Sequence, residues 1–309
     1  MAARDGYLGD LLDSGARLLE ATCGFCIGNS QSPKTTGVSL RTSNRNFEGR
    51  SGTQDAQVYL VSPEVAALAA ITGKMTDPRK AGIEYPTVSM PTKFLIDDSM
   101  FIFPKDADRN IEIVRGPNIG TPPVNDKMPE QIKGIVGIKV GDKITTDHIM
   151  PAGARLKYRS NVPKYSEYVF EQIDPTFPKR ALEAKKKGLH TVVVAGESYG
   201  QGSSREHAAL CPMYLGVKAI IAKSVERIHA ANLVNFGIIS LSFRNMADYD
   251  KIEQGDEIEI PDIKKKLQND EPIILVNKTK NLKIELGYNL SQRQKAILYE
   301  GGLLSYTVK

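Results

Sequence analysis

The spacing of hydrophobic residues predicts two helices and a strand near the start of the chain. Leucines recur at near-helical spacing over residues 6–20, and the run QVYLV at residues 57–61 is typical of a strand. The stretch SPEVAALAAITGK, residues 62–74, predicts a helix that Ser62 can cap and Gly73 can end, with Pro63 in its first turn. This part of the chain therefore mixes helix and strand.

Eight prolines interrupt residues 75–130, which form the second part of the pattern. Proline removes a backbone donor and clashes with the preceding helical turn, so we expect no sustained helix here. The pattern still allows short strands, for example at residues 101–103. The composition predicts a linker that wraps over the surface, with the next domain beginning near residue 120.

From residue 132 the pattern alternates between short apolar runs and helical stretches. It predicts strands at residues 132–140, 190–198, 217–222 and 238–243. It predicts helices at residues 203–216 and 224–237, the second capped by Ser224 and ended by Gly237. Residues 252–309 add three short strand candidates, DEIEI, PIILV and LKIEL. Strands that alternate with helices imply parallel pairing through right-handed crossovers, so the predicted fold class is α/β with mostly parallel strands.

Composition narrows the classes of function. The chain has 41% hydrophobic and 25% charged residues, and no apolar run approaches the roughly 18 residues that span a membrane. Charged residues within residues 1–15 argue against a secretory signal, and three cysteines fit a reducing compartment better than a disulfide scaffold. The net charge of +5 is compatible with an anionic substrate, whereas the scattered basic residues do not favour nucleic acid as the main partner.

Cys23 and Cys26 form the first candidate site, in the stretch CGFCIG. A thioredoxin-type redox pair normally opens a helix after a strand, whereas this pair follows a helical run. A zinc site needs two more Cys or His ligands, and an iron–sulfur cluster needs more than two thiolates. Taken alone, the motif leaves open a redox pair, a metal site and two buried free thiols.

Arg45 and Arg50 form the second candidate site, within RTSNRNFEGRSG at residues 41–52. A stretch rich in glycine, serine and asparagine is by default a solvated loop. The alternative is a clamp for carboxylate or phosphate, because arginine keeps its charge and presents a planar fork of donors.

The third candidate site is GESYGQGSSREHAAL, residues 196–210, in which three glycines precede Ser203. Ser203 and Glu206 match a capping box, so Ser203 can be a helix cap and nothing more. The same helix start can hold an anion, either a ligand carboxylate or a serine alkoxide, and Arg205 adds permanent charge. The chain has no G-x-S-x-G elbow, which disfavours ordinary serine hydrolase chemistry.

The fourth candidate site is TTDHIMPAGARLKYR, residues 145–159. Asp147 beside His148 could orient a proton carrier, or Asp147 could cap a helix or pair with an arginine. Arg159 taken alone is typical of a surface residue.

The four stretches CGFCIG, TSNRNFEGRSG, TTDHI…LKYR and GSSREHAAL, taken in this order, resemble the aconitase family. The resemblance covers nearly the whole chain and is to the C-terminal part of bacterial-type members. It implies the end of an incomplete three-layer α/β domain at residues 1–80, an interdomain linker at residues 81–120, and a swivelling β/α domain at residues 121–309. It also implies a hydro-lyase that converts citrate through cis-aconitate to isocitrate.

The resemblance implies a role for each candidate residue. Cys23 and Cys26 would be two of three thiolates of a 4Fe–4S cluster, with Asn44 beside it. Ser203 would act as an alkoxide base, with Asp147 and His148 as further catalytic residues. The groups that would hold the substrate carboxylates are Arg45, Arg50, Arg159, Ser204 and Arg205.

In the family the third cluster cysteine precedes the C-x-x-C motif, and the 22 residues before Cys23 contain no cysteine. We therefore expect a fragment or one subunit of a split enzyme, inactive without the missing N-terminal aconitase domains, in a bacterial cytoplasm rather than a mitochondrial matrix. Cys211 is expected to be a small buried hydrophobic residue. Two alternatives stay open: a homoaconitase or 3-isopropylmalate isomerase-like hydro-lyase, and an RNA-binding relative without a cluster.

Overall fold

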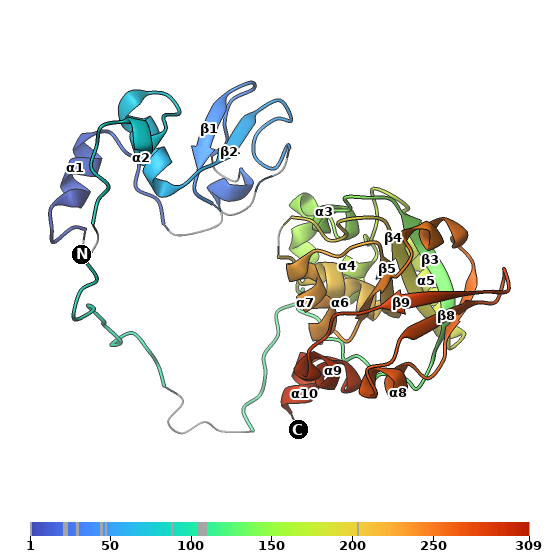
Figure 1. Ribbon diagram of the computed structural model, residues 1–309. Helices are drawn as coiled ribbons and strands as arrows, with labels where there is room; N and C mark the ends of the chain where they lie inside the picture. The colour runs from blue at the N-terminus through green and yellow to red at the C-terminus, as the bar shows by residue number, and fades with distance from the viewer. Residues whose placement is uncertain are drawn as a thin grey trace. The chain divides into compact units, whose positions relative to one another are not determined.

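The computed structural model describes the chain apart from residues 1, 21–23, 29–30, 44–45, 47, 88, 104–109, 203 and 309. The chain forms two compact units, residues 1–112 (unit 1) and residues 113–309 (unit 2), shown in Figure 1. The predicted domain ranges 1–80, 81–120 and 121–309 stay a prediction.

The described residues of unit 1 contain a small parallel sheet and two α-helices. Its elements are α1 (Tyr7–Asp13), η1 (Phe25–Ile27), β1 (Val38–Arg41), β2 (Gln57–Leu60), α2 (Pro63–Thr72) and η2 (Pro78–Lys80). The predicted boundaries of α2 are confirmed, because the Ser62 hydroxyl accepts a bond from the Val65 N–H at 3.3 Å and Gly73 ends the helix with a φ of +71°. The helix predicted at residues 6–20 is shorter than expected and ends at Asp13.

The apolar residues of unit 1 are mostly exposed. Leu68 of α2 is the one buried hydrophobic side chain among its described residues. Four of the five leucines in the first 20 residues, Leu11, Leu12, Leu18 and Leu19, are exposed, as are Tyr59 and Leu60 of β2. Two strands and two helices bury too little apolar surface for a large core. The local turns of unit 1 are therefore held mainly by hydrogen bonds.

The proline-rich segment forms little regular structure. Between α2 and residue 131 the described residues contain η2 and no strand, so the strand left open at residues 101–103 is not formed. Proline explains this result, because it cannot donate to a ladder or continue a helix.

Unit 2 is built around a seven-stranded barrel. Its strands are β3 (Ile132–Val140), β4 (His190–Ala195), β5 (Val217–Ala222), β6 (Ile239–Phe243), β7 (Glu257–Ile260), β8 (Ile273–Asn277) and β9 (Leu282–Gly287). Its helices are α3 (Thr146–Ile149), η3 (Gly153–Tyr158), α4 (Val162–Ser166), α5 (Phe177–Lys186), α6 (His207–Tyr214), α7 (Arg227–Asn235), η4 (Met246–Lys251), α8 (Ile263–Gln268), α9 (Gln292–Tyr299) and α10 (Leu303–Thr307). Every strand predicted for this unit is present, which confirms the α/β class.

The barrel closes in the order β3-β4-β5-β6-β9-β8-β7. Strands β3 to β6 pair in parallel, as predicted. The pairings that involve β7, β8 and β9 are antiparallel, so the expectation of mostly parallel strands fails for the C-terminal third. Only residues 278–281 join β8 to β9, and a connection this short allows a hairpin but no crossover.

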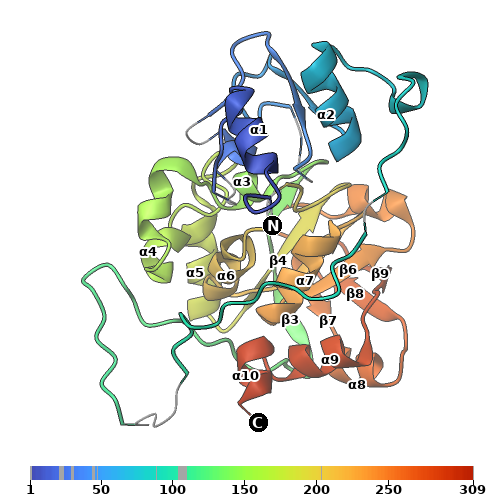
Figure 2. The ribbon, with the colours of Figure 1, turned by 90° about the vertical axis from the view of Figure 1, so that its left-hand side faces the viewer.

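Two hydrophobic clusters stabilise unit 2. One takes side chains from all seven strands and from α8 and α9. The other lies between β3, β4 and β5 and the helices α3 to α7. Gly137 marks the irregularity in β3 where the register with β4 shifts, and a Cβ there would lie 2.4 Å from the Thr191 methyl carbon. Figure 2 shows α8, α9 and α10 together at one end of the unit.

Helix α7 begins later than predicted. Its N-cap is Glu226 rather than Ser224, whose hydroxyl instead accepts a bond from the Ser198 N–H at 2.7 Å. Gly237 ends the segment with a φ of +69°, as predicted. No helix in the described part of the chain combines the length and the apolar character needed to cross a bilayer.

Candidate functional site

The cysteine turn and the arginine loop meet in unit 1. Cys26 lies in η1 as a half-buried free thiol, and Arg50 Nη2 donates to its sulfur at 3.4 Å. Gly28 follows with a φ of +73°, and a Cβ there would lie 3.2 Å from the Ser51 hydroxyl. Glycine at this position therefore lets the turn pack against the loop.

The sheet of unit 1 anchors both segments. Arg41 at the end of β1 donates to the Phe25 carbonyl at 2.7 Å, and Asn46 donates to the Val58 carbonyl of β2 at 2.6 Å. Cys23, Asn44 and Arg45 lie outside the described residues. Of the candidate residues in this unit, the structure thus brings together Cys26 and Arg50.

The fit of an iron–sulfur cluster can be tested on these residues. A half-buried thiol that accepts an N–H bond is a suitable cluster ligand, because such bonds tune cluster sulfurs. However, within the described part of the chain no three His, Cys, Asp or Glu side chains gather closely enough to hold a metal. Cys26, with Cys23 in the sequence, fits part of a cluster site and does not complete one.

In unit 2, three loops meet where β3, β4 and β5 end. The loop at residues 198–202 follows β4, the segment at residues 144–147 follows β3, and the segment at residues 224–226 follows β5. The N–H groups of Gly200 and Gln201 donate to the Ile144 carbonyl at 2.7 and 3.1 Å, and the Thr146 N–H donates to the Gln201 carbonyl at 2.8 Å. In α/β folds, barrels as well as open sheets, ligands bind at the carboxyl ends of parallel strands, and Asp147 and Arg205 of unit 2 meet at this edge.

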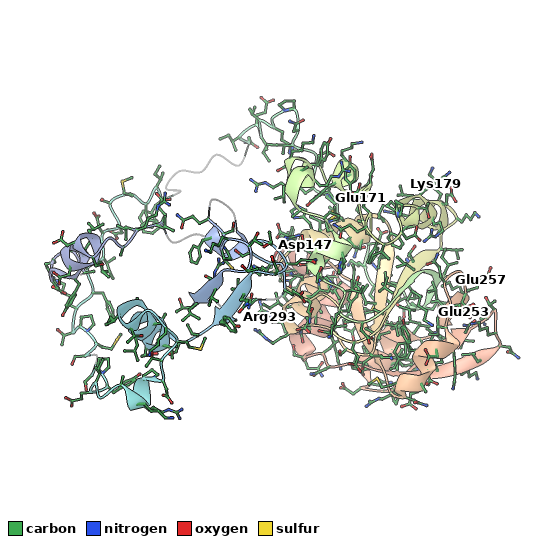
Figure 3. The ribbon with its side chains drawn as sticks, turned by 90° about the horizontal axis from the view of Figure 1, so that it is seen from above. Asp147, Glu171, Lys179, Glu253, Glu257 and Arg293 are labelled. Atoms are coloured by element: carbon green, nitrogen blue, oxygen red, sulfur yellow. The ribbon has the colours of Figure 1, made fainter. Side chains whose placement is uncertain are left out.

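Arg205 and Asp147 form an ion pair that joins two of the sequence motifs. Both side chains are partly exposed, Arg205 to 21% and Asp147 to 37%, so the pair borders solvent. Figure 3 labels Asp147 on unit 2. The carboxylate orients the guanidinium and leaves other N–H groups of its fork for a ligand.

His148 does not pair with Asp147, so of the alternatives left open for Asp147 the pairing with an arginine is the one that the structure shows. Its Nδ1 accepts the Thr145 N–H at 3.1 Å, while the Thr145 hydroxyl accepts the His148 N–H at 3.1 Å, a capping box at the start of α3. A neutral ring that accepts at Nδ1 carries its proton on Nε2. Asp147 is engaged by Arg205 instead.

Helix α6 starts at His207, four residues later than predicted from Ser203. Its N-cap is Glu206, so the capping box expected from Ser203 and Glu206 is not the start of the helix. Ser203 itself lies outside the described residues. Ser204 is exposed, and Arg205 precedes the helix with its side chain turned to Asp147. The positive charge beside this stretch therefore comes mainly from the Arg205 guanidinium and less from the N–H groups of the first turn of α6.

His207 is a residue to which the sequence assigned no role. Its Nε2 lies 2.9 Å from the Arg159 carbonyl, which can only accept, so Nε2 is the donor. The ring packs edge-on against Tyr165, whose hydroxyl donates to the Pro151 carbonyl at 2.8 Å. Burial raises the pKa of Tyr165 to about 12. His207 thus connects the Arg159 segment to the start of α6. Its position two residues after Arg205 is the sequence feature that could have indicated a role in the site.

Arg159 follows η3 and has an exposed side chain. Its backbone is held at both groups, since its N–H donates to the Leu156 carbonyl at 3.0 Å and its carbonyl accepts from His207. A fixed backbone with an exposed guanidinium suits a group that reaches a charged ligand.

Comparisons with known proteins match both units. Residues 1–73 match the model of the aconitase family (aconitate hydratase), and residues 142–246 match the aconitase C-terminal domain. The probable mitochondrial aconitate hydratase of Dictyostelium discoideum is 32% identical over 98% of this chain and 45% of that protein. The mitochondrial homocitrate dehydratase of Saccharomyces cerevisiae is 30% identical over 83% of this chain and 38% of that protein.

Among solved structures, a 3-isopropylmalate dehydratase from Methanocaldococcus jannaschii is 34% identical. The match covers 58% of this chain and 93% of that chain, with a TM-score of 0.48.

The chain spans less than half the length of the curated relatives that it matches. The names of these relatives place them in mitochondria, so they lend no support to the bacterial cytoplasm expected above. Two models of one family match in the expected order, and relatives of the same family align over nearly all of the sequence. The chain belongs to the aconitase family.

Proposed function

We propose that this chain is the C-terminal part of an aconitate hydratase, which converts citrate to isocitrate through cis-aconitate. The observation that supports this most directly is the Arg205–Asp147 pair, which joins the SSRE and TTDH stretches at the carboxyl edge of the barrel. Unit 1 adds a second arginine, Arg50, beside the Cys26 thiol. The four motifs of the family thus gather into two cation-bearing clusters, one in each unit.

A tricarboxylate needs several fixed positive groups. Arg50, Arg159 and Arg205 supply permanent charge with planar donor forks, and Arg45 is proposed as a fourth. Asp147 holds Arg205 in one direction, and His207 holds the backbone of Arg159. Closure of a swivelling unit 2 on unit 1 would bring both sets to one substrate, which stays a prediction.

Proton transfer is assigned to Ser203 and its neighbours. Ser203 would remove the proton next to a carboxylate, and the charge of Arg205 would stabilise its alkoxide. Ser204, which is exposed, would hold a substrate carboxylate. His148 is proposed as a further catalytic residue whose Nε2–H would donate a hydrogen bond to the substrate, while Asp147 acts by orienting Arg205.

Cys23 and Cys26 would hold a 4Fe–4S cluster, which when bound supplies a Lewis acid for the substrate hydroxyl. We propose that the third thiolate comes from N-terminal aconitase domains, on a further segment or a separate subunit. The exposed apolar side chains of unit 1, with Leu68 as its one buried hydrophobic group among the described residues, support a partner that covers them.

The test is reconstitution. The chain is combined with the N-terminal domains of an aconitase, iron and sulfide under reducing conditions, and cis-aconitate is followed by its ultraviolet absorbance. We expect citrate–isocitrate interconversion that neither part shows alone. A complex that loads a cluster but turns over no citrate would contradict the proposal.

The second candidate is a homoaconitase-type activity. A homocitrate dehydratase and a homoaconitase are among the relatives, at 30% and 32% identity. The two candidates are distinguished by comparing kcat/KM of the reconstituted enzyme for citrate, homocitrate and 3-isopropylmalate. We expect citrate to lead, since LKYR with Arg159 resembles the tricarboxylate-binding form.

A further inference from the structure

The loop that leads into Ser203 carries an unusual backbone conformation at Ser198. Its φ is +59°, in the left-handed region that residues with a side chain rarely adopt. Gly200 and Gly202 follow with φ values of +86° and +96°, where glycine meets no steric penalty. Ser198 needs outside support to keep this conformation.

The start of α7 supplies that support. The Ser198 hydroxyl donates to the Glu226 carboxylate and accepts from Gln201 Nε2 at 3.1 Å. The Ser198 and Tyr199 N–H groups donate to the hydroxyl and carbonyl of Ser224 at 2.7 and 3.0 Å, and the Glu226 N–H donates to the Tyr199 carbonyl at 2.9 Å. One carboxylate thus ends a chain of bonds that runs through the loop.

His229, in the first turn of α7, packs against the same loop. It is 1% exposed, and a Cβ added at Gly200 would lie 2.3 Å from its ring. The loop backbone therefore rests directly on the imidazole, and α7 holds the loop at two points.

The usual role of an acidic residue at this position does not explain Glu226. An acidic N-cap normally bonds to the free N–H groups of its own helix. Glu226 is the N-cap of α7 but makes no side-chain cap bond there, in the part of the chain that the structure describes. A carboxylate beside a site for anions also repels the ligand, so its presence calls for a structural reason.

We propose that Glu226 is a positioning residue of the site, which holds Ser198 and Gln201 and so fixes the backbone of residues 198–202, the loop that precedes Ser203 and Arg205 in the sequence. The inference rests on the proposed function for its catalytic consequence, but its structural part stands without it. Glu226 acts through an accepted hydrogen bond and touches no reacting atom. A neutral acceptor of the same shape should therefore serve.

The experiment compares Glu226→Ala and Glu226→Gln with Glu253→Ala as the matched control. Figure 3 shows Glu253 on the side of unit 2 away from Asp147, and it pairs with Lys280 at 3.1 Å. In the chain alone, amide hydrogen exchange at residues 199–201 is measured. We expect about tenfold faster exchange in Glu226→Ala, near wild-type rates in Glu226→Gln and no change in Glu253→Ala.

In the reconstituted enzyme, Glu226→Ala should lower kcat about tenfold or more with a smaller change in KM, and Glu226→Gln should restore most of it. Unchanged exchange in Glu226→Ala would overturn the proposal. Fast exchange with a wild-type kcat would overturn the positioning role. Fast exchange together with no turnover in the wild type would instead contradict the proposed function and leave the support of the loop by Glu226 intact.

Unfolding of Glu226→Ala would be seen as fast exchange of the β5 amides. In that case Ser198→Ala tests the proposal, with amide exchange and kcat measured in the same way. It removes the hydroxyl that donates to Glu226 and leaves the carboxylate in place. The expected result is the same faster exchange at residues 199–201, and wild-type exchange would overturn the proposal.

Discussion

The two units hold their site residues in different ways. Unit 2 has two buried clusters that take side chains from the strands of a closed barrel and from its helices, and its candidate residues lie in segments near the strand ends. Unit 1 has a two-stranded sheet and one buried hydrophobic side chain among its described residues, Leu68. Unit 2 thus supports its candidate residues from its own core, whereas we propose that unit 1 needs a partner to cover its apolar side chains. The following experiments test this difference.

The largest expected effect is on turnover, at Arg205, whose guanidinium is held by Asp147. Arg205→Ala should lower kcat/KM of the reconstituted enzyme by about a hundred- to a thousandfold, because it removes the charge at the site and leaves Asp147 unpaired. Arg205→Lys should be intermediate, since it keeps the charge but not the fork.

Arg180→Ala is the matched control for this prediction. It breaks a comparable pair with Asp174, 2.6 Å apart, on α5, away from the loops of the site. Arg180 lowers the pKa of Asp174 to about 2, so its loss should cost stability while kcat/KM stays unchanged. Equal losses of activity in both variants would refute the assignment of Arg205.

The next effect is on folding. Leu275→Ala opens a cavity at a fully buried position of β8 and should lower the stability of unit 2 by about 2–5 kcal/mol in urea unfolding. Leu68→Ala in unit 1 should leave that transition where it is. A comparable shift from Leu68→Ala would mean that the two units share one folding transition.

A smaller effect concerns pH. His229 lies buried under the site loop, and burial lowers its pKa to about 4. The unfolded imidazole takes up a proton near its ordinary value, whereas the folded one resists until about pH 4. In that window the unfolded state binds more protons, so the stability of unit 2 should fall as the pH falls. Between pH 7 and 5 the loss is about 2 kcal/mol.

His229→Phe keeps a ring under Gly200 and removes the titration. We expect urea midpoints at pH 7 and pH 5 to move together in this variant, apart from the contribution of His190, whose pKa is lowered chiefly by burial and in addition by Lys218. An unaltered pH dependence would show that another group carries it.

The smallest effect lies in unit 1. Ser62→Ala removes the cap of α2 and should cost that helix about 1 kcal/mol, seen as faster exchange of the Val65 amide. Because unit 1 has little core to compensate, the loss should shrink when the N-terminal domains are added. A loss of the same size in both states would argue that no partner stabilises α2.

Features that depend on interactions between residues close in the sequence could be predicted, whereas features that depend on distant residues could not. The ends of α2 were predictable because Ser62 bonds to a residue three positions on and Gly73 supplies its own positive φ. The strands of the barrel were predictable from their apolar runs. The antiparallel C-terminal strands were not, since pairing depends on which strands lie side by side and on connection lengths.

Of two features of the site, the sequence left one open and mispredicted the other. Asp147 could have oriented His148, capped a helix or paired with an arginine, and its partner is Arg205, 58 residues away. Helix α6 was predicted to start at Ser203, but it starts at His207. Arg205 therefore lies before the helix, and its side chain pairs with Asp147. A capping box is a local pattern, and a tertiary ion pair can override it.

The sequence by itself determined the local elements with their caps and stops, and the four ordered motifs that identify the family. Only the tertiary structure decided that the loops after β3, β4 and β5 meet, that Asp147 orients Arg205, and that Glu226 and His229 hold the loop before Ser203. Helix ends depend on bonds between residues three or four positions apart, which a sequence displays directly. Contacts between strand ends depend on the order in which strands pair, which no short stretch of the chain contains.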